Sequence, residues 1–265
     1  PAATMRLISE EERDGTLEIL FTQPISGWSV VFAKFVGGLS FVSLGIAGTI
    51  AIPLFLSTAG DIDVGAIIGQ YLGSILLAGA LVSIGLFCSS LSRNQIVAFM
   101  VGVTINGILM LLGMDIVLHS VSSKVGVIFH GLSPLSHFSN VARGVLPFRD
   151  VLYFVVLTTT FLAMTYLMVR SKNLSHKSGL YHNLQVGVVG LVVASLLVGW
   201  FGGSIGGRWD FTNNNRYSID PATVSLVSST DDLVIFKLFS SQDIPAEYAF
   251  VKRETEDFLS DLKNV

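Results

Sequence analysis

The stretch VGAIIGQYLGSILLAGALVSIGLFCSSLS, residues 64–92, holds 29 consecutive positions without a charged side chain. Its apolar residues do not alternate with polar ones, as they would in a half-buried strand. A helix of about 20 apolar residues is long enough to cross the hydrocarbon core of a bilayer. The stretch therefore predicts a transmembrane helix near residues 66–91 and makes a membrane protein the expected fold class.

Four more charge-free stretches repeat this pattern and contain 26, 21, 19 and 30 residues, at 35–60, 94–114, 151–169 and 178–207. Backbone polar groups in lipid must bond within their own segment, so each stretch is expected to be helical. A lipid-facing barrel would instead show ten-residue segments of alternating polarity. The further expected spans are 35–58, 95–118, 151–169 and 184–206, which gives five in all.

The composition supports a polytopic membrane protein. Of 265 residues, 51% are hydrophobic and 13% charged, too few charges to cover an ordinary soluble fold and too few for a disordered chain. Residues 1–34 hold 8 of the 35 charged side chains and residues 208–265 hold 16, so charge gathers at two ends around an apolar body. The net charge of −3 lacks the basic face that nucleic-acid binding needs. The chain has one cysteine, Cys88, so an intrachain disulfide is excluded. Because Cys88 lies in an apolar stretch, we expect it to pack as a small hydrophobic residue.

Residues 125–142 form a sixth uncharged stretch that is poor material for a span, because it contains two histidines, a proline and several serines. We interpret it as part of a re-entrant or interfacial segment, 120–148. With a cytoplasmic N-terminus, seven lysines and arginines lie in inside segments and three in outside segments, which favours this orientation. Five spans then place 207–265 outside the cell; if 125–142 also crosses, that region is cytoplasmic.

The charged segment before the first span reads RLISEEERDGTLEILFTQP, residues 6–24. Ser9 and Glu12 have the spacing of a capping box, so a helix is expected to begin there. Gly15 and Thr16 interrupt it, and Thr16 is expected to cap a second short helix that Pro24 ends. Ser26 is expected to cap the helix that enters the membrane. From the pattern alone this is a solvated amphipathic element on the cytoplasmic face.

The same residues resemble the first cytoplasmic loop of type-2 ABC exporter permeases. The resemblance lies in the form Glu-Glu-x-x-Gly-Thr-Leu-Glu-x-Leu followed by proline, and it continues at Lys34, 71–73, 90–95, 132–138 and 143–144, over about residues 1–172. In that family the loop couples the permease to an ATPase subunit. The resemblance thus implies an ATPase-coupling role for Glu11, Glu12, Gly15, Thr16, Leu17, Glu18 and Leu20. The glutamates are expected to meet basic groups of the ATPase, and the leucines an apolar pocket on it.

The resemblance also implies partners: a separate cytoplasmic ABC ATPase, and a second permease half or a second copy of the chain. Because the sequence begins at Pro1 on a polar helix, it carries no signal peptide, and we expect a fragment that lacks the first span of the family. The sparse basic loops and five spans suggest a multi-pass protein of the bacterial inner membrane.

A polar basic linker, residues 170–183, precedes the span 184–206. Residues 208–212 and 216–223 then resemble the start of the extracytoplasmic domain of a Gld-type auxiliary subunit, which is associated with gliding-motility transporters. The residues themselves predict helices over 221–229 and 246–262 and a buried strand over 233–239. These elements are too few to close a core, so 207–265 is expected to be a truncated α/β domain.

The sequence carries no motif for catalysis, a cofactor or a metal. It lacks the Gly-x-x-x-x-Gly-Lys-Ser/Thr phosphate loop and the Gly-x-Gly-x-x-Gly loop. His119, His130 and His137 lack zinc-site spacing, and we favour hydrogen-bonded interfacial histidines. Gln70 and Asn106 are polar groups inside spans, and interhelical hydrogen bonds are favoured over substrate contact. Gly69 and Gly73 have a spacing that permits close helix packing, a weak signal in a chain with 26 glycines.

Together these features predict an all-α polytopic membrane protein followed by a partial α/β domain. Its expected organisation is a coupling segment 1–34, permease helices 35–169, the linker 170–183, the anchor 184–206 and the domain 207–265. The favoured function is a non-catalytic permease subunit of an ABC exporter, fused to a Gld-type auxiliary domain. The alternative is a non-transporting membrane scaffold that anchors an outside binding domain. An intramembrane enzyme is disfavoured, since the spans hold no paired ionisable groups.

Overall fold

The structure is a computed structural model that describes residues 1–173 and 208–212. Beyond Asn173 it also describes 186–187, 189–190, 222–223, 225, 229, 237–240, 251, 255 and 258–259. The expected span 184–206, the strand 233–239 and the helices 221–229 and 246–262 lie mostly outside the described residues.

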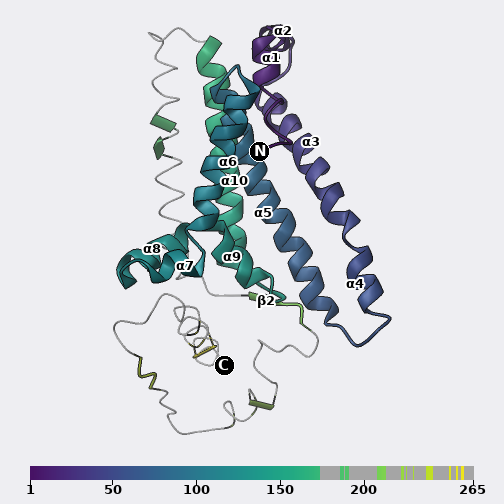
Figure 1. Cartoon of the computed structure of the whole chain (residues 1–265), viewed down its shortest axis with the longest axis vertical. Helices are drawn as coiled ribbons and strands as arrows, with labels where there is room; N and C mark the ends of the chain where they lie inside the picture. The colour runs from purple at the N-terminus through teal and green to yellow at the C-terminus, as the bar shows by residue number, and fades with distance from the viewer. Residues whose placement is uncertain are drawn as a thin grey trace.

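The described part is a bundle of long helices with short helices at both ends (Figure 1). The long helices are α3 (Gly27–Gly48), α5 (Val64–Leu91), α6 (Gln95–Leu111) and α10 (Phe148–Asn173). Helices α1 (Ser9–Arg13) and α2 (Thr16–Thr22) lie at one end. At the other end lie α4 (Ala51–Leu56), α7 (Asp115–His119), α8 (Ser123–Leu132) and α9 (Pro134–Val141).

Three helical stretches of the described residues are long and apolar enough to cross a membrane: Gly27–Leu56, Val64–Leu91 and Phe148–Lys172. The expected helical membrane fold is thereby confirmed. Helix α5 matches the expected span 66–91 closely, because Asp63 caps its start with a 3.0 Å bond to the N–H of Ala66. Helix α10, with 26 residues, is longer than the 19-residue charge-free stretch that predicted it, whereas α3, with 22 residues, begins before its stretch and ends within it.

The first span differs most from its prediction. Helix α3 begins at Gly27, where the Ser26 hydroxyl accepts the N–H of Ser29 at 3.1 Å, as the sequence led us to expect. The helix is interrupted after Gly48 and resumes as α4, which contains Pro53. Proline has no N–H to donate and clashes with the carbonyl four residues before it, which accounts for the break near Thr49.

The third long helix, α6, is shorter than expected. Helix α6 ends at Leu111 instead of 118, so its 17 residues span about 25 Å. Met114 has an extended backbone with ψ of 137° and starts α7 as a separate helix. Helices α8 and α9, with 10 and 8 residues, are each too short to cross a bilayer, and both lie at the end of the bundle opposite α1.

Two short strands close the end of the bundle where α10 begins. Strand β1 (Val145–Pro147) pairs with β2 (Arg208–Asp210) in antiparallel register, with Val145 opposite Asp210. The N–H of Phe211 donates to the carbonyl of Gly144 at 3.0 Å, and Trp209 packs edge-on against Phe148 with centroids 4.8 Å apart. The chain therefore returns between Asn173 and Arg208 to the end from which α10 started.

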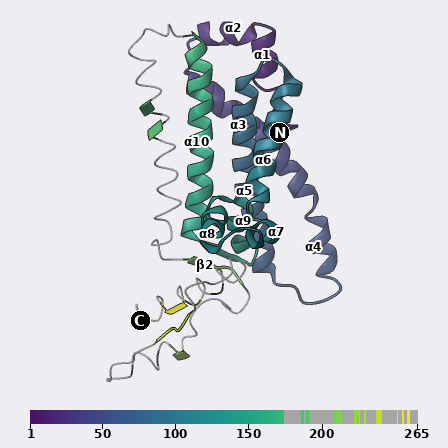
Figure 2. The ribbon, with the colours of Figure 1, turned by 60° about the vertical axis from the view of Figure 1, so that its left-hand side comes forward.

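Helix α5 is the centre of the bundle and contacts α3, α6, α9 and α10 (Figure 2). Its buried face consists largely of glycine, alanine and serine. A Cβ at Gly69 would lie 2.8 Å from the Cα of Gly144, and a Cβ at Gly73 would lie 2.8 Å from Val141. The Gly69–Gly73 spacing therefore marks a close contact, and its partner is the α9–β1 segment.

Substituting Gly69 by alanine is expected to lower the free energy of unfolding by about 1–3 kcal/mol, because the new methyl meets backbone atoms that cannot rotate away. Thermal unfolding of the detergent-solubilised protein, followed by tryptophan fluorescence, measures the change. Gly37→Ala is the matched control, since nothing lies within 4 Å of its Cβ position on α3. Equal melting temperatures for the two variants would show that the contact at Gly69 is not tight.

Candidate functional site

Helices α1 and α2 form a cap on one end of the bundle, held at its start by Ser89 of α5. The buried hydroxyl of Ser89 accepts the N–H groups of Ile8 and Ser9, each at 3.1 Å, and donates to the carbonyl of Met5 at 3.0 Å. The side chain of Ser9 donates to Met5 as well. Ser9 is thus the first residue of α1 and not its cap, because its hydroxyl is spent on the preceding turn.

The break between α1 and α2 lies where the sequence predicts it. Gly15 has a φ of +72°, a left-handed conformation that other residues adopt at a cost, and no atom lies within 4 Å of its Cβ position. Gly15 itself is the N-cap position of α2, so Thr16 is the first helical residue instead of the expected cap. The hydroxyl of Thr16 donates to the carbonyl of Glu11 at 3.3 Å and bridges the break.

Glu11 ties the cap to α3. Its carboxylate lies 2.5 Å from Nζ of Lys34, which also donates to the carbonyl of Leu7 at 2.6 Å. The Lys34 side chain is only 15% exposed, so the charge of Glu11 compensates a lysine that is largely withdrawn from water. Lys34 lies inside α3 and does not mark its start.

Glu12 ties the cap to the rest of the bundle. One carboxylate oxygen lies 2.5 Å from Nζ of Lys172 on α10, and the other accepts from Nε of Arg93 at 3.2 Å, in the turn between α5 and α6. Lys172 also donates to the carbonyl of Ser90 at 2.6 Å. The Glu12 side chain is 10% exposed and that of Lys172 26%, whereas that of Arg93 is 77% exposed, so the carboxylate and the lysine are largely withdrawn from water and the arginine is not.

Leu17 completes the attachment through apolar packing. It is 6% exposed and belongs to the buried cluster formed with Ile8, Val31, Phe35, Val82, Leu86, Leu162 and Val169. Leu20 is half-buried. The structure therefore differs from the expectation that Glu11, Glu12 and Leu17 all face a partner protein, because each has its own contacts within the chain.

The outward side of the cap consists of the α1–α2 turn and one face of α2. Arg13, Asp14, Gly15 and Thr16 are exposed, and Ile19 is 62% exposed. Nε of Arg13 donates to Asp14 at 3.0 Å, and this hydrogen bond raises the pKa of the Arg13 guanidinium. The structure does not describe the side chain of Glu18. Of the residues named from the sequence, Gly15 and Thr16 are thus the ones placed on the open surface.

A second polar cluster lies at the opposite end, around Asp150 in the first turn of α10. Its fully buried carboxylate lies 2.6 Å from Nδ1 of His137 and accepts from the amide of Asn140 at 3.1 Å. Nε2 of His137 faces the carbonyl of Gly131 at 3.0 Å, and the ring stacks on Tyr153 with centroids 3.8 Å apart. The cluster fastens α8 and α9 to α10.

The two polar residues expected inside spans bond to neighbouring elements. The Asn106 amide on α6 donates to the carbonyl of Leu81 on α5 at 3.3 Å. The Gln70 amide on α5 donates to the carbonyl of Ala142 at 3.2 Å. Within the described part of the chain, no three acidic, histidine or cysteine side chains are grouped so that they could hold a metal ion.

Sequence reasoning missed Arg93, Lys172 and Asp150 as site residues. In the sequence Lys172 and Arg93 helped to set the orientation of the chain, and Arg93 also lies in the resembling segment 90–95, but neither use pairs them with Glu12, which is 160 and 81 residues away. No local spacing reveals such a contact. A usable signal existed for Asp150, since an acidic residue directly before a 19-residue apolar stretch needs a partner.

Comparison with protein families gives two matches. Residues 2–174, well over half of the chain, match the family described as ABC-2 family transporter protein. Residues 213–265 match a domain of unknown function (DUF7088). No curated protein and no solved structure matches the chain.

A double-mutant cycle tests the junction at Glu12. Glu12→Gln combined with Lys172→Gln is expected to give a coupling energy of about 1–3 kcal/mol, the range for a shielded, charged hydrogen bond. Unfolding of the solubilised protein supplies the four stabilities. Glu10→Gln with Arg13→Gln is the control, because that exposed pair is 3.7 Å apart and should show no measurable coupling. Equal coupling in both cycles would contradict a special role for Glu12.

Replacing Asp150 by asparagine is expected to lower the free energy of unfolding by about 1–3 kcal/mol, because the donors of His137 and Asn140 then lose a buried acceptor. The thermal unfolding measurement used for Gly69 reports the loss. Asp61→Asn, an exposed position in the loop before α5, should leave stability unchanged. A stable Asp150 variant would show that the cluster does not hold α9 against α10.

Proposed function

The chain belongs to the ABC-2 transporter family, and we propose that it is the permease subunit of an ABC exporter. Membership makes it a membrane component of an ABC transporter and a multi-pass membrane protein. In the proposed function a separate cytoplasmic ATPase hydrolyses ATP and drives substrate movement through the bundle. The bacterial inner membrane is the proposed location, and a second permease half or a second copy of the chain completes the proposed pathway.

The observation that carries the proposal is the two-sided character of the cap. Its outward side, the α1–α2 turn with Ile19, is open for a partner, and its inward side is fixed to the bundle by Leu17 and two glutamates. A force applied at the turn therefore reaches the membrane helices through defined contacts. A solvated helix without a mechanical role would not need ion pairs to three different elements.

The two glutamates have different targets, which suggests how motion is divided. Glu11 pulls on α3 through Lys34, whereas Glu12 pulls on α10 and on the α5–α6 turn. If the ATPase tilts the cap, the Glu11–Lys34 ion pair moves α3, and the ion pairs of Glu12 move α10 and the α5–α6 turn at the same time. We therefore assign Glu11, Glu12 and Leu17 a transmitting role, and Gly15, Thr16 and the exposed Ile19 the docking role. Glu18 is proposed for docking from the sequence resemblance.

The C-terminal region extends the proposal. Strand β2 begins at Arg208 beside the start of α10, so the chain resumes at the end of the bundle opposite the cap. A domain that follows it would lie outside the cell if the cap is cytoplasmic. We propose that 213–265 is the start of an extracytoplasmic auxiliary domain of the Gld type.

The docking surface can be tested with Ile19→Asp in the chain co-expressed with a candidate ABC ATPase subunit that co-purifies with the unchanged chain. A charge on an exposed apolar contact is expected to reduce ATPase co-purification at least tenfold, since hot-spot side chains at interfaces are worth about 2 kcal/mol or more. The matched control is Ile116→Asp on α7, which is 73% exposed at the other end. Equal co-purification of both variants would remove α2 from the interface.

Transmission is tested separately with Glu12→Gln in reconstituted vesicles. The ATPase should still co-purify, while the coupling between ATP turnover and transport falls, because the link to α10 is lost. Transport that continues without any ATPase would contradict the permease assignment. Membrane anchoring of the C-terminal domain that needs neither the ATPase nor Glu12 would favour the scaffold alternative.

A further inference from the structure

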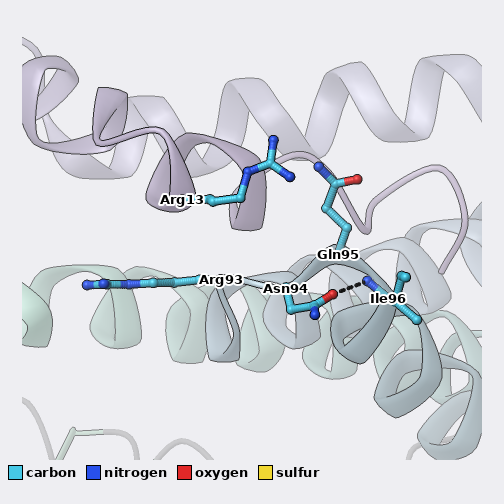
Figure 3. A pocket seen from close by; sticks show the side chains of 5 residues that line it. All are labelled: Arg13, Arg93, Asn94, Gln95 and Ile96. Atoms are coloured by element: carbon cyan, nitrogen blue, oxygen red, sulfur yellow. Dashed lines mark hydrogen bonds between the residues drawn. The ribbon is translucent and has the colours of Figure 1, made fainter.

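A cleft of about 310 Å³ lies between the end of α1 and the turn that joins α5 to α6 (Figure 3). Arg13 forms one wall, and Arg93, Asn94, Gln95 and Ile96 form the facing wall. In Figure 3 the Gln95 side chain extends from the α5–α6 turn toward the side of the cleft on which Arg13 lies. The volume is at the lower end of the range for small-molecule sites and fits a single polar headgroup.

The polar groups of the cleft are mostly donors. Both arginines can only donate, and the Nε of each is already bonded, that of Arg13 to Asp14 and that of Arg93 to Glu12, so the remaining guanidinium N–H groups are the donors to consider. Asn94 has already used its acceptor, Oδ1, on the N–H of Ile96 at 2.9 Å. That leaves the Asn94 amide as a further donor, with the carbonyl of Gln95 as the main side-chain acceptor. A group rich in acceptor oxygens, such as a phosphate or a carboxylate, fits this set best.

An apolar strip continues from the cleft along α6. Ile96, Met100 and Val103 are 69%, 63% and 45% exposed and stand at positions i, i+4 and i+7, so they share one face of the helix. The strip starts inside the cleft with Ile96 and runs into the predicted span. The surface therefore offers hydrogen-bond donors at the helix end and hydrocarbon contacts below it.

We propose that this cleft binds the phosphate of an anionic phospholipid whose acyl chains lie along Ile96, Met100 and Val103. Arginines at the membrane surface attract anionic headgroups, and the apolar strip gives the chains a place beside α6. An acidic segment of a soluble partner could accept hydrogen bonds from these donors, but it would not cover the apolar strip on α6. The proposal does not depend on ATPase coupling, because the lipid site requires only the bundle and the cap.

The test uses the full purified chain in detergent, supplemented with phosphatidylglycerol or phosphatidylcholine, and counts retained lipids by native mass spectrometry. The unchanged protein should retain one phosphatidylglycerol in preference to phosphatidylcholine. Gln95→Glu adds a negative charge to the cleft without touching an ion pair, and should lower retention about fivefold, the factor that one charge contributes at an anionic lipid surface. Arg13→Gln should lower it to a similar extent.

Arg170→Gln is the matched control. Arg170 is exposed and lies on α10 at the same end of the bundle as the cleft, but it does not line the cleft. It should retain the lipid, and the melting temperature of each variant verifies the fold. Excess inorganic phosphate should not displace the lipid, since it has no acyl chains; displacement would identify a free-anion site and overturn the proposal. So would equal retention of the two lipids, or an equal loss in the Arg170 variant.

One outcome separates lipid from protein. If Gln95→Glu leaves lipid retention intact and lowers co-purification of the ATPase, the cleft is a protein contact and the lipid assignment is wrong. If lipid retention falls while ATPase binding is unchanged, the cleft binds lipid whatever the outcome for the permease function.

Discussion

The close packing around α5 is the constraint on which the bundle depends. In lipid, apolar side chains gain little from leaving one hydrocarbon surrounding for another, so helices associate where their backbones can approach closely. Helix α5 allows this along its buried face, because most of the buried residues between Gly65 and Ser90 are small. Gly69 meets Gly144, and Gly85 meets the turn that precedes α1. The same helix thus positions both the cap and the Asp150 cluster at the opposite end of the bundle.

At both ends of this apolar bundle, ion pairs between charged side chains hold neighbouring elements together. At the end that carries the cap, Glu11 and Glu12 face lysines and an arginine, and at the opposite end Asp150 faces His137. A carboxylate withdrawn from water is costly unless it is paired, so each cluster specifies one arrangement of the elements that meet there. The cap is consequently a rigid extension of the bundle on its inward side, with an exposed outward side.

The sequence predicts the helices well where charges flank them closely and less well elsewhere. Helix α5 was located to within two residues, since Asp63 and Arg93 bracket it. Helix α3 begins eight residues before the expected span. A charged residue such as Lys34 suggests the edge of a span, but here Lys34 lies within the helix and its long side chain reaches the carbonyl of Leu7. Gly15 was predicted as a break from its residue type. The partners of Glu12 could not be predicted, since they are brought together only by the packing of α10 against α5.

The antiparallel pair of β1 and β2 has a consequence for whatever follows Thr212. The two strands join the start of α10 to the point where the chain resumes, so the polypeptide between Pro147 and Arg208 forms a closed loop. A rotation of α10 about its axis is carried by the ladder into β2 with little slack, since Pro147 immediately precedes Phe148. The strand pair therefore holds Arg208–Asp210 against the start of α10, so these residues follow the helix when it turns.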